Sequence, residues 1–258
     1  MRLGENANID TQAFRRDFCA LPQSTLTRLP HLFRAMKFPS LCAALALLAG
    51  DALFAQTAPM SLPAVPASAP AGSVVLWNGH DLTGWTPFFK GGIPAPPDFW
   101  SADQGVLKLK GKPSGYIRTN QSYANYHLHV EWRWPGLPPK GVNNSGVFVD
   151  QRPPDVVWPY SVQIQTKTGS AGDLIAQGGL FFSTGPTQLT LKKMAAPNEK
   201  PVGQWDGCDI FCRGASIEVF VNGLRQNFVD KLPADSGEIA LQMEGYPVEF
   251  RNVWLQQL

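Results

Sequence analysis

Polar side chains that can move protons recur on one face of a predicted strand. In the stretch HLHVEWRW, strict alternation places four polar residues opposite Leu128 and Trp132. The four are His127, His129, Glu131 and Arg133. A histidine and a carboxylate on one face form a candidate pair for general acid–base chemistry. We therefore take Glu131 as the first candidate for acid–base work and His129 as a second proton-transfer group.

Glutamines and acids occupy the polar face of two further predicted strands. Gln163 and Gln165 alternate with apolar residues in SVQIQT, and Gln242 and Glu244 do so in IALQME. Planar amides and carboxylates match sugar hydroxyls, and aromatic rings stack on the C–H faces of sugars. We expect these strands and the His129 strand to form one concave polar surface that binds carbohydrate, with Glu244 as an alternative proton-transfer group.

A turn of unusual polarity precedes the strand at 146–150. The residues Asn143, Asn144 and Ser145 fit a plain turn, a glycosylation sequon or the polar lip of a binding site. We discount the sequon because the N-terminal leader is of bacterial type. Asp150 closes this strand and supplies a further carboxylate.

The segment 74–258 is predicted to be all-β. Apolar alternating stretches recur between Gly, Pro, Asn and Asp residues, and no stretch keeps a helical period. The economical solution is one two-sheet sandwich.

The N-terminal residues differ from this pattern. Arg34 and Lys37 precede the short apolar run LCAALALLAGDALFAQ, which is too short for a permanent membrane span. We interpret 1–55 as an N-terminal extension with a secretory signal, 56–73 as a Pro/Ala-rich linker and 74–258 as the folded domain. The domain is expected to be exported, to the periplasm or the medium.

Charge and cysteine content exclude several classes. A formal net charge of +2 without basic runs argues against nucleic-acid binding, and no Gly-rich phosphate loop follows a strand. Cys208 and Cys212 lie on one face of an extended stretch about 13 Å apart, beyond the ~7 Å that a disulfide spans. We expect two buried free thiols.

Five stretches, in order over almost all of 74–258, resemble the 3-keto-disaccharide hydrolase family. They are LWNGHDLTGW, FWSADQGVLKLKG, YHLHVEWRW with NNSGVFV, KPVGQWDGCDIFCRGASIEVFVNG, and GEIALQMEGYPVEFRNVWLQQL. The resemblance implies a concanavalin A-like, glucanase-like jelly roll acting on glycosides oxidised at C3. A C3 ketone acidifies the C2–H, so a base, an oxyanion donor and an acid for the leaving oxygen suffice. This chemistry makes sense without a strongly bound metal. Metal binding is left open: Ca²⁺ is one divalent cation that such sandwiches can hold, although no spaced Asp/Asn loop of the calcium-binding kind is present.

The resemblance also carries residues over. The matches are Glu131, Arg133, Asn144, Ser145, Gly146, Gln163, Gln242, Arg251 and Asn252. We expect substrate contacts from Asn144, Ser145, Gln163, Gln165, Asp150, Arg133 and Gln242. Arg251 and Asn252 are expected to fix the ends of the sheet by hydrogen bonding and not to touch substrate, and Arg133 is a structural partner of Glu131 or a catalytic group.

Two departures from the family pattern leave the function open. Ser161 and Thr166 stand where the family commonly has acids, and Asp150 stands where it often has arginine. Three hypotheses follow: an enzyme that cleaves 3-keto-glycosides, a non-catalytic carbohydrate-binding module, and a structural module of the cell envelope. A partly buried carboxylate or histidine beside the sugar ring would distinguish the enzyme from the binder.

Overall fold

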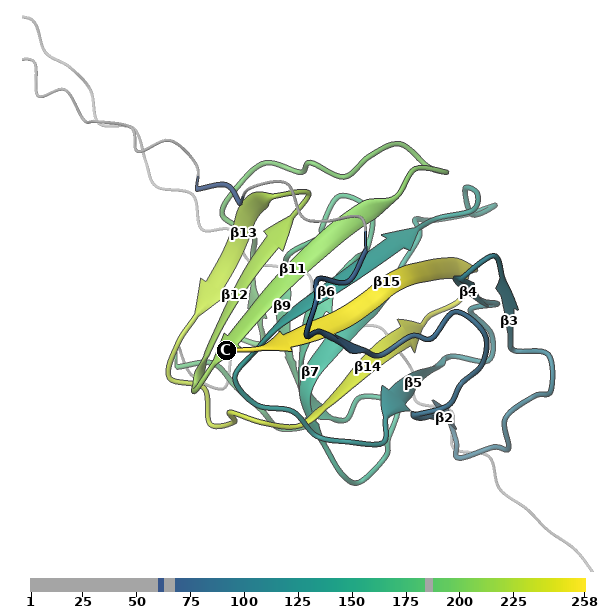
Figure 1. The fold of residues 1–258 in the computed structure, drawn as a ribbon, viewed down its shortest axis with the longest axis horizontal. Helices are drawn as coiled ribbons and strands as arrows, with labels where there is room; N and C mark the ends of the chain where they lie inside the picture. The colour runs from purple at the N-terminus through teal and green to yellow at the C-terminus, as the bar shows by residue number, and fades with distance from the viewer. Residues whose placement is uncertain (1–59, 63–67, 184–187) are drawn as a thin grey trace, which may run out of the picture. The chain divides into compact units, whose positions relative to one another are not determined.

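The computed structural model describes residues 60–62, 68–183 and 188–258, which form two antiparallel sheets packed face to face (Figure 1). These residues contain strands and no helix, and so no helix that could cross a membrane. The predicted leader, with Cys19 and Cys42, lies outside the described residues. The all-β sandwich is confirmed.

The front sheet in Figure 1 contains the strand that carries His129 and Glu131. Its order is β13 (Leu224–Val229), β12 (Ser216–Val221), β11 (Asp206–Arg213), β6 (Tyr126–Arg133), β15 (Val248–Gln257), β4 (Val106–Leu109) and β3 (Trp100–Asp103), with β1 (Val74–Val75) paired to β15. Because β6 lies between β11 and β15, its outward polar side chains have neighbours from both of these strands.

The back sheet contains the glutamine strands. Its order is β10 (Thr190–Leu191), β9 (Leu174–Gln177), β8 (Tyr160–Gln165), β7 (Gly146–Arg152), β14 (Glu238–Met243), β5 (Gly115–Thr119) and β2 (Trp85–Phe89). Strands β8 and β14 both pair with β7, so their polar faces lie on either side of it.

The core between the sheets follows the predicted alternation. Leu128, Val130 and Trp132 of β6 are fully buried, and Ile239 and Leu241 of β14 face them from the other sheet's inner side. Each large apolar side chain buried in this way contributes about 1.5–3 kcal/mol. Burial of these residues forces their polar neighbours onto the two outer faces.

The cysteines of β11 behave as predicted. Cys208 and Cys212 are both buried in the core and both are free thiols. Burial raises the thiol pKa of each of them, which keeps them uncharged and poorly reactive.

Three residues of the predicted linker belong to the sandwich. Ser61 forms an antiparallel bridge with Leu224, Leu62 donates its backbone N–H to Gly223 at 2.7 Å, and Arg225 donates to Met60 at 3.0 Å. The ordered structure therefore includes residues upstream of the predicted start near Val74. β13 is an edge strand, so its outer backbone N–H and C=O groups have no partner within the sheet and can form hydrogen bonds with an extended segment.

Candidate functional site

The predicted site residues lie on both outer faces of the sandwich. His129, Glu131 and Arg133 belong to β6 of the front sheet, whereas Gln163 and Gln242 belong to β8 and β14 of the back sheet. The expectation of one shared polar surface is therefore wrong. Alternation assigned each side chain to a face of its own strand but could not say which sheet the strand would join.

A groove on the back sheet is lined by four of the ten predicted site residues. This back groove has a volume of about 360 Å³ and is lined by Asn144, Trp158, Gln163, Gln165, Gln177 and Glu244, with Ile175 and Ala176. Its polar side chains come from β8, from β9 and from the residues that flank β7 and β14.

The side-chain amides of the back groove form a continuous hydrogen-bonded chain. Gln177 donates to Oε1 of Gln163, and Gln163 donates through Nε2 to Oε1 of Gln165 and of Gln242, each at 3.3 Å. Gln242 in turn donates to Oε2 of Glu244 at 2.8 Å. The chain therefore links four glutamine amides to one carboxyl group, and all of these residues except Gln242 line the groove.

The turn before β7 supports this chain. Gly146 lies beside Gln163, and a Cβ at this position would come within 2.6 Å of Nε2 of Gln163. Ser145 is fully buried and its hydroxyl donates to the backbone carbonyl of Gln242 at 2.7 Å. Asn144 lines the groove, and its Oδ1 is buried without a hydrogen-bond partner among the described residues. Asn144 is therefore the one residue of the Asn-Ser-Gly turn that lines the groove, and Ser145 and Gly146 lie behind it.

Asn143, the asparagine of the sequon, does not reach solvent. Its side chain is 2% exposed and donates to the backbone carbonyl of Gly136 at 3.1 Å. A glycan could not be attached here without unfolding the turn, which agrees with the decision to discount the sequon.

The loop at 153–159 brings Trp158 to the groove. Asp155 anchors the loop by accepting hydrogen bonds from Nε and Nη2 of Arg118, at 2.9 and 3.0 Å, and one from the Tyr116 hydroxyl at 2.9 Å. Tyr116 packs edge-on against Phe148 on the same outer face. Trp158 remains 44% exposed, so its ring is free to stack on a ligand.

Glu244 is the ionisable group of the back groove. Partial burial raises the pKa of its carboxyl above the ordinary value, against the lowering effects of the Gln242 hydrogen bond and of Lys167. A raised pKa makes the carboxylate a stronger base and brings it closer to the range in which acid–base catalysis is efficient.

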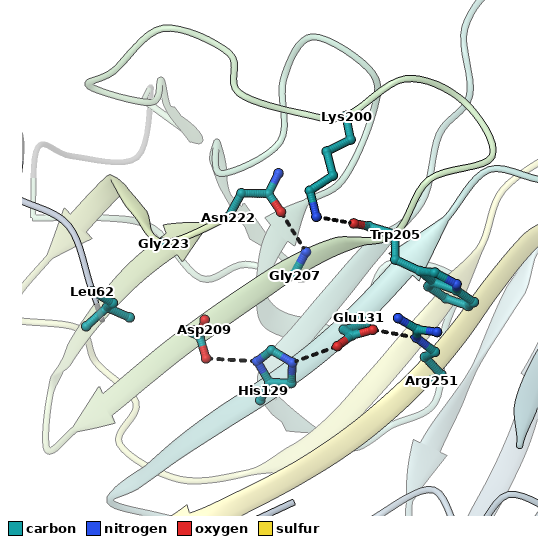
Figure 2. Close-up of a pocket in the computed structure, with 10 residues that line it drawn as sticks. All are labelled: Leu62, His129, Glu131, Lys200, Trp205, Gly207, Asp209, Asn222, Gly223 and Arg251. Atoms are coloured by element: carbon teal, nitrogen blue, oxygen red, sulfur yellow. Dashed lines mark hydrogen bonds and ion pairs between the residues drawn. The ribbon is translucent and has the colours of Figure 1, made fainter. Parts of the chain in front are cut away.

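The front sheet carries a second depression, the front cleft, shown in Figure 2. It is lined chiefly by His129, Glu131, Lys200, Trp205, Asp209 and Arg251. The register of the sheet brings four of them together, because Asp209 lies opposite His129 and Arg251 lies opposite Glu131.

These four residues form one charged network. Asp209 and Nδ1 of His129 are 2.9 Å apart, and Nε2 of His129 lies 3.6 Å from Oε1 of Glu131. Arg251 donates through Nε to Oε2 of Glu131 at 2.5 Å, and Asn252 donates to Oε1 at 2.9 Å. Figure 2 shows the three ion pairs as one line across β11, β6 and β15.

The network favours the charged forms of both Glu131 and His129. Burial opposes ionisation of Glu131, but the nearby ring of His129 and hydrogen bonds from Asn252 and Arg251 outweigh it and lower the pKa to about 2. Burial likewise opposes the charge on His129, but Asp209 and Glu131 raise its pKa to about 9. Glu131 is therefore a fixed carboxylate and His129 a fixed cation at neutral pH. Such fixed charges suit binding better than proton exchange.

Arg133 has a different partner from the one expected. It pairs with Glu249 at 2.5 Å, while Arg251 takes the place beside Glu131. Both guanidinium groups lie over the ring of Trp205, at 4.6 and 4.2 Å. Arg251 and Asn252 do stabilise the sheet by hydrogen bonding, and they do so at its centre.

Asp150 lines neither depression. It sits at a bulge in β7 with φ of 53°, and it is 2% exposed. Burial raises its carboxyl pKa to about 6. Its charge influences Tyr126 and Cys212, which belong to the core.

Ser161 and Thr166, which stand where the family commonly has acids, lie next to lining residues of the back groove. Ser161 is fully buried and its hydroxyl contacts the Pro159 carbonyl at 3.0 Å and Gln177 at 3.3 Å. Thr166 is also buried. The groove therefore has no carboxyl on β8 and relies on Glu244 alone.

Sequence reasoning missed several lining residues. Trp158, Gln177, Lys200, Trp205 and Asn222 line the two depressions but were not among the candidates. A tryptophan between prolines in a predicted loop was the usable signal for Trp158. Within the described residues no group of three or more His, Cys, Asp or Glu side chains is placed to hold a metal ion.

A two-sheet antiparallel sandwich with an amide-lined groove defines a glucanase-like jelly roll. The chain belongs to the 3-keto-α-glucoside-1,2-lyase-like domain family, whose model matches residues 72–256. This confirms the family predicted from the five motif stretches. The search of curated proteins found no match.

Solved structures share the fold. A protein of Parabacteroides distasonis described as a candidate glycosyl hydrolase is 22% identical with a TM-score of 0.51, over 72% of this chain and 94% of that one. The β-glucanase of Bacillus licheniformis is 15% identical with a TM-score of 0.50, over 74% of this chain and 100% of that one. At these identities the likeness concerns the fold alone, and it confirms the predicted glucanase-like class.

Proposed function

We propose that the protein is an enzyme that cleaves 3-keto-glycosides and binds the oxidised sugar in the back groove. One observation carries the proposal: a hydrogen-bonded chain of glutamine amides that ends on Glu244, a half-buried carboxyl with a raised pKa. Family membership supplies the substrate class, because the family is named for 3-keto-glucosides.

In the proposed reaction Glu244 acts as the base. The C3 ketone acidifies the C2–H bond, so the carboxylate takes this proton while charge moves onto the C3 oxygen. The enediolate then expels the C1 oxygen, which receives a proton from water as the C1–O bond breaks. The products are an unsaturated keto sugar and the free alcohol, and addition of water across the double bond completes a net hydrolysis.

The remaining groove residues would bind the sugar and stabilise the negative charge that develops on its C3 oxygen. The amide N–H groups of Gln165 and the second N–H of Gln177 are placed to donate to sugar oxygens, including the C3 oxygen as it becomes negative. The buried Oδ1 of Asn144 would accept from a sugar hydroxyl, which would provide its missing partner. Trp158 would stack on the sugar ring.

A second candidate function is a carbohydrate-binding module without catalysis. The presence of Ser161 and Thr166, in place of the family's acids, favours it. The amide chain and Trp158 would serve a binder equally well, so the two functions differ only in what Glu244 does.

The deciding experiment uses the purified protein and the p-nitrophenyl 3-keto-α-glucoside, because the family is named for α-glucosides. The wild type should release p-nitrophenol from the 3-keto-glucoside and not from the unoxidised glucoside, and Glu244→Gln should abolish the release. Glu238→Gln is the matched control, because Glu238 lies on β14 outside the groove. Saturable binding of the 3-keto-glucoside without release would establish the binder instead.

We also propose that the domain works outside the cytoplasm, as the signal-like run in 1–55 indicates. Fractionation of expressing bacteria should place the full chain outside the inner membrane. A chain that lacks residues 1–55 should stay inside, and equal export of both chains would contradict the proposal.

A further inference from the structure

The front cleft lies on the sheet opposite to the back groove, so the proposed catalysis makes no use of it. We propose that it binds a small organic carboxylate, such as the acid group of an acidic sugar, through His129, Lys200 and Arg251. The proposal rests on the donors and acceptors that line the cleft and goes beyond the proposed function (Figure 2).

One ring nitrogen of His129, at the wall of the cleft, is buried and faces Glu131 at a distance too long for a hydrogen bond. His129 is 3% exposed, and its Nδ1 pairs with Asp209 at 2.9 Å. Its Nε2 is buried without a hydrogen-bond partner in the described parts of the chain, and the nearest carboxylate oxygen, on Glu131, is 3.6 Å away. A buried polar atom of this kind costs stability unless a ligand or water pairs with it.

Lys200 and Arg251 each have N–H groups that form no hydrogen bond among the described residues. Lys200 uses one of its three N–H donors on the Trp205 carbonyl, at 2.7 Å. Arg251 uses its Nε on Glu131, and no hydrogen bond among the described residues uses its terminal nitrogens. The planar guanidinium is suited to bind a carboxylate with two parallel hydrogen bonds.

Three of the four carboxylate oxygens that line the cleft already accept a hydrogen bond or ion pair, and only Oδ2 of Asp209 has none among the described residues. Both oxygens of Glu131 accept hydrogen bonds, from Arg251 and Asn252, and Oδ1 of Asp209 is shared by His127 and His129. A neutral sugar hydroxyl needs an acceptor as well as a donor, so the cleft favours a ligand that only accepts.

The charges of the lining residues agree with this choice. His129, Lys200 and Arg251 are positive, and only Glu131 and Asp209 are negative, which leaves one positive charge for the ligand to neutralise. A singly charged carboxylate therefore fits better than a doubly charged phosphate group.

The rim of the cleft is held in place before a ligand arrives. Asp206 accepts hydrogen bonds from the backbone N–H of Lys200 and from Asn222, both at 2.8 Å. Asn222 accepts in turn from the backbone of Gly207 at 3.0 Å. Because these groups do not need to be ordered on binding, little of the binding free energy is lost.

The test is a titration of the full chain with D-glucuronate, with D-glucose and acetate as comparators, following the ring nitrogen resonances of His129. Glucuronate should shift Nε2 of His129 in a saturable manner, acetate should compete with it, and glucose should have no effect. Lys200→Met should weaken glucuronate binding about fivefold, the factor expected for one partly exposed ion pair.

Two controls make the result specific. Lys90→Met should bind glucuronate like the wild type, because Lys90 is an exposed lysine just after β2 of the back sheet. Glu244→Gln should also bind it normally, so this proposal stands or falls separately from the proposed function. An unshifted His129, an equal response to glucose, or equal weakening by Lys200→Met and Lys90→Met would each overturn the proposal.

Discussion

Glu131 and Glu244 lie on opposite sheets, and their surroundings displace their carboxyl pKa values in opposite directions. Glu131 is surrounded by donors of positive charge, which favour the carboxylate. Glu244 is half-buried with one amide donor, so its proton is held more tightly than usual. The same residue type is therefore a fixed charge on one face and a titrating group on the other.

The proposed role of Glu244 predicts a specific pH profile. The basic form is the carboxylate, so kcat/KM should rise with pH through the raised pKa, with the acidic limb above the ordinary value of 4.5. Glu244→Gln should lower kcat/KM by about 100-fold or more, the range of general base catalysis. Steady-state rates on a 3-keto-glucoside check both points. If kcat/KM of Glu244→Gln still falls at low pH in the same way, the titrating group is a residue other than Glu244.

The charged network of the front cleft predicts a window of maximal stability. Glu131 has a lowered pKa, so its contribution is complete above 4.5 and is lost as the pH falls toward about 2. His129 has a raised pKa, so its contribution is complete below 6.5 and is lost as the pH rises through about 9. Urea unfolding should show greatest stability from this network between pH 4.5 and 6.5.

Glu131→Gln tests that window. The variant should lose about 2 kcal/mol of unfolding free energy inside the window, because Arg251 and His129 lose their charged partner. The loss should shrink as the pH falls toward 2, where the wild-type carboxyl is itself protonated. A pH-independent loss would mean that packing, and not charge, explains the effect.

Trp158 is predicted to contribute affinity without taking part in the chemistry. Trp158→Ala should raise KM for a 3-keto-glucoside about tenfold, which corresponds to ~1.4 kcal/mol of lost stacking, and should leave kcat nearly unchanged. Val156→Ala is the matched control, since Val156 lies in the same loop with the same 44% exposure. Equal effects of the two changes would show that the loop, and not the indole ring, is responsible.

The contact between Gly146 and Gln163 predicts a rescue. An alanine Cβ at 146 would come within 2.6 Å of the Gln163 amide, so Gly146→Ala should cost about 1–3 kcal/mol by overpacking and displace the amide chain. Adding Gln163→Ala should restore most of this stability but not activity.

Gly136→Ala serves as the control for that experiment. A Cβ at 136 would meet no atom within 4 Å, so the change should alter the unfolding free energy by no more than about 0.5 kcal/mol. Thermal and urea unfolding are measured for Gly146→Ala, Gln163→Ala, the double variant and Gly136→Ala. Additive losses in the double variant would refute a direct clash between 146 and 163.

The sequence by itself determined which side chains of a strand face the core between the sheets. Alternation placed Leu128, Val130 and Trp132 in the core and His129 and Glu131 outside it, and the structure agrees. This information is local, because successive side chains of a strand point to opposite faces whatever the strand pairs with. The motif stretches were likewise sufficient to identify the family over residues 72–256.

Only the tertiary structure decided which polar faces meet. The pairing of β6 with β11 and β15 brought Asp209 and Arg251 to His129 and Glu131, and gave Arg133 to Glu249 instead. These partners are 80 or more residues apart in the chain. Sheet membership and register depend on contacts of such long range, and a repeat of two residues carries no information about them.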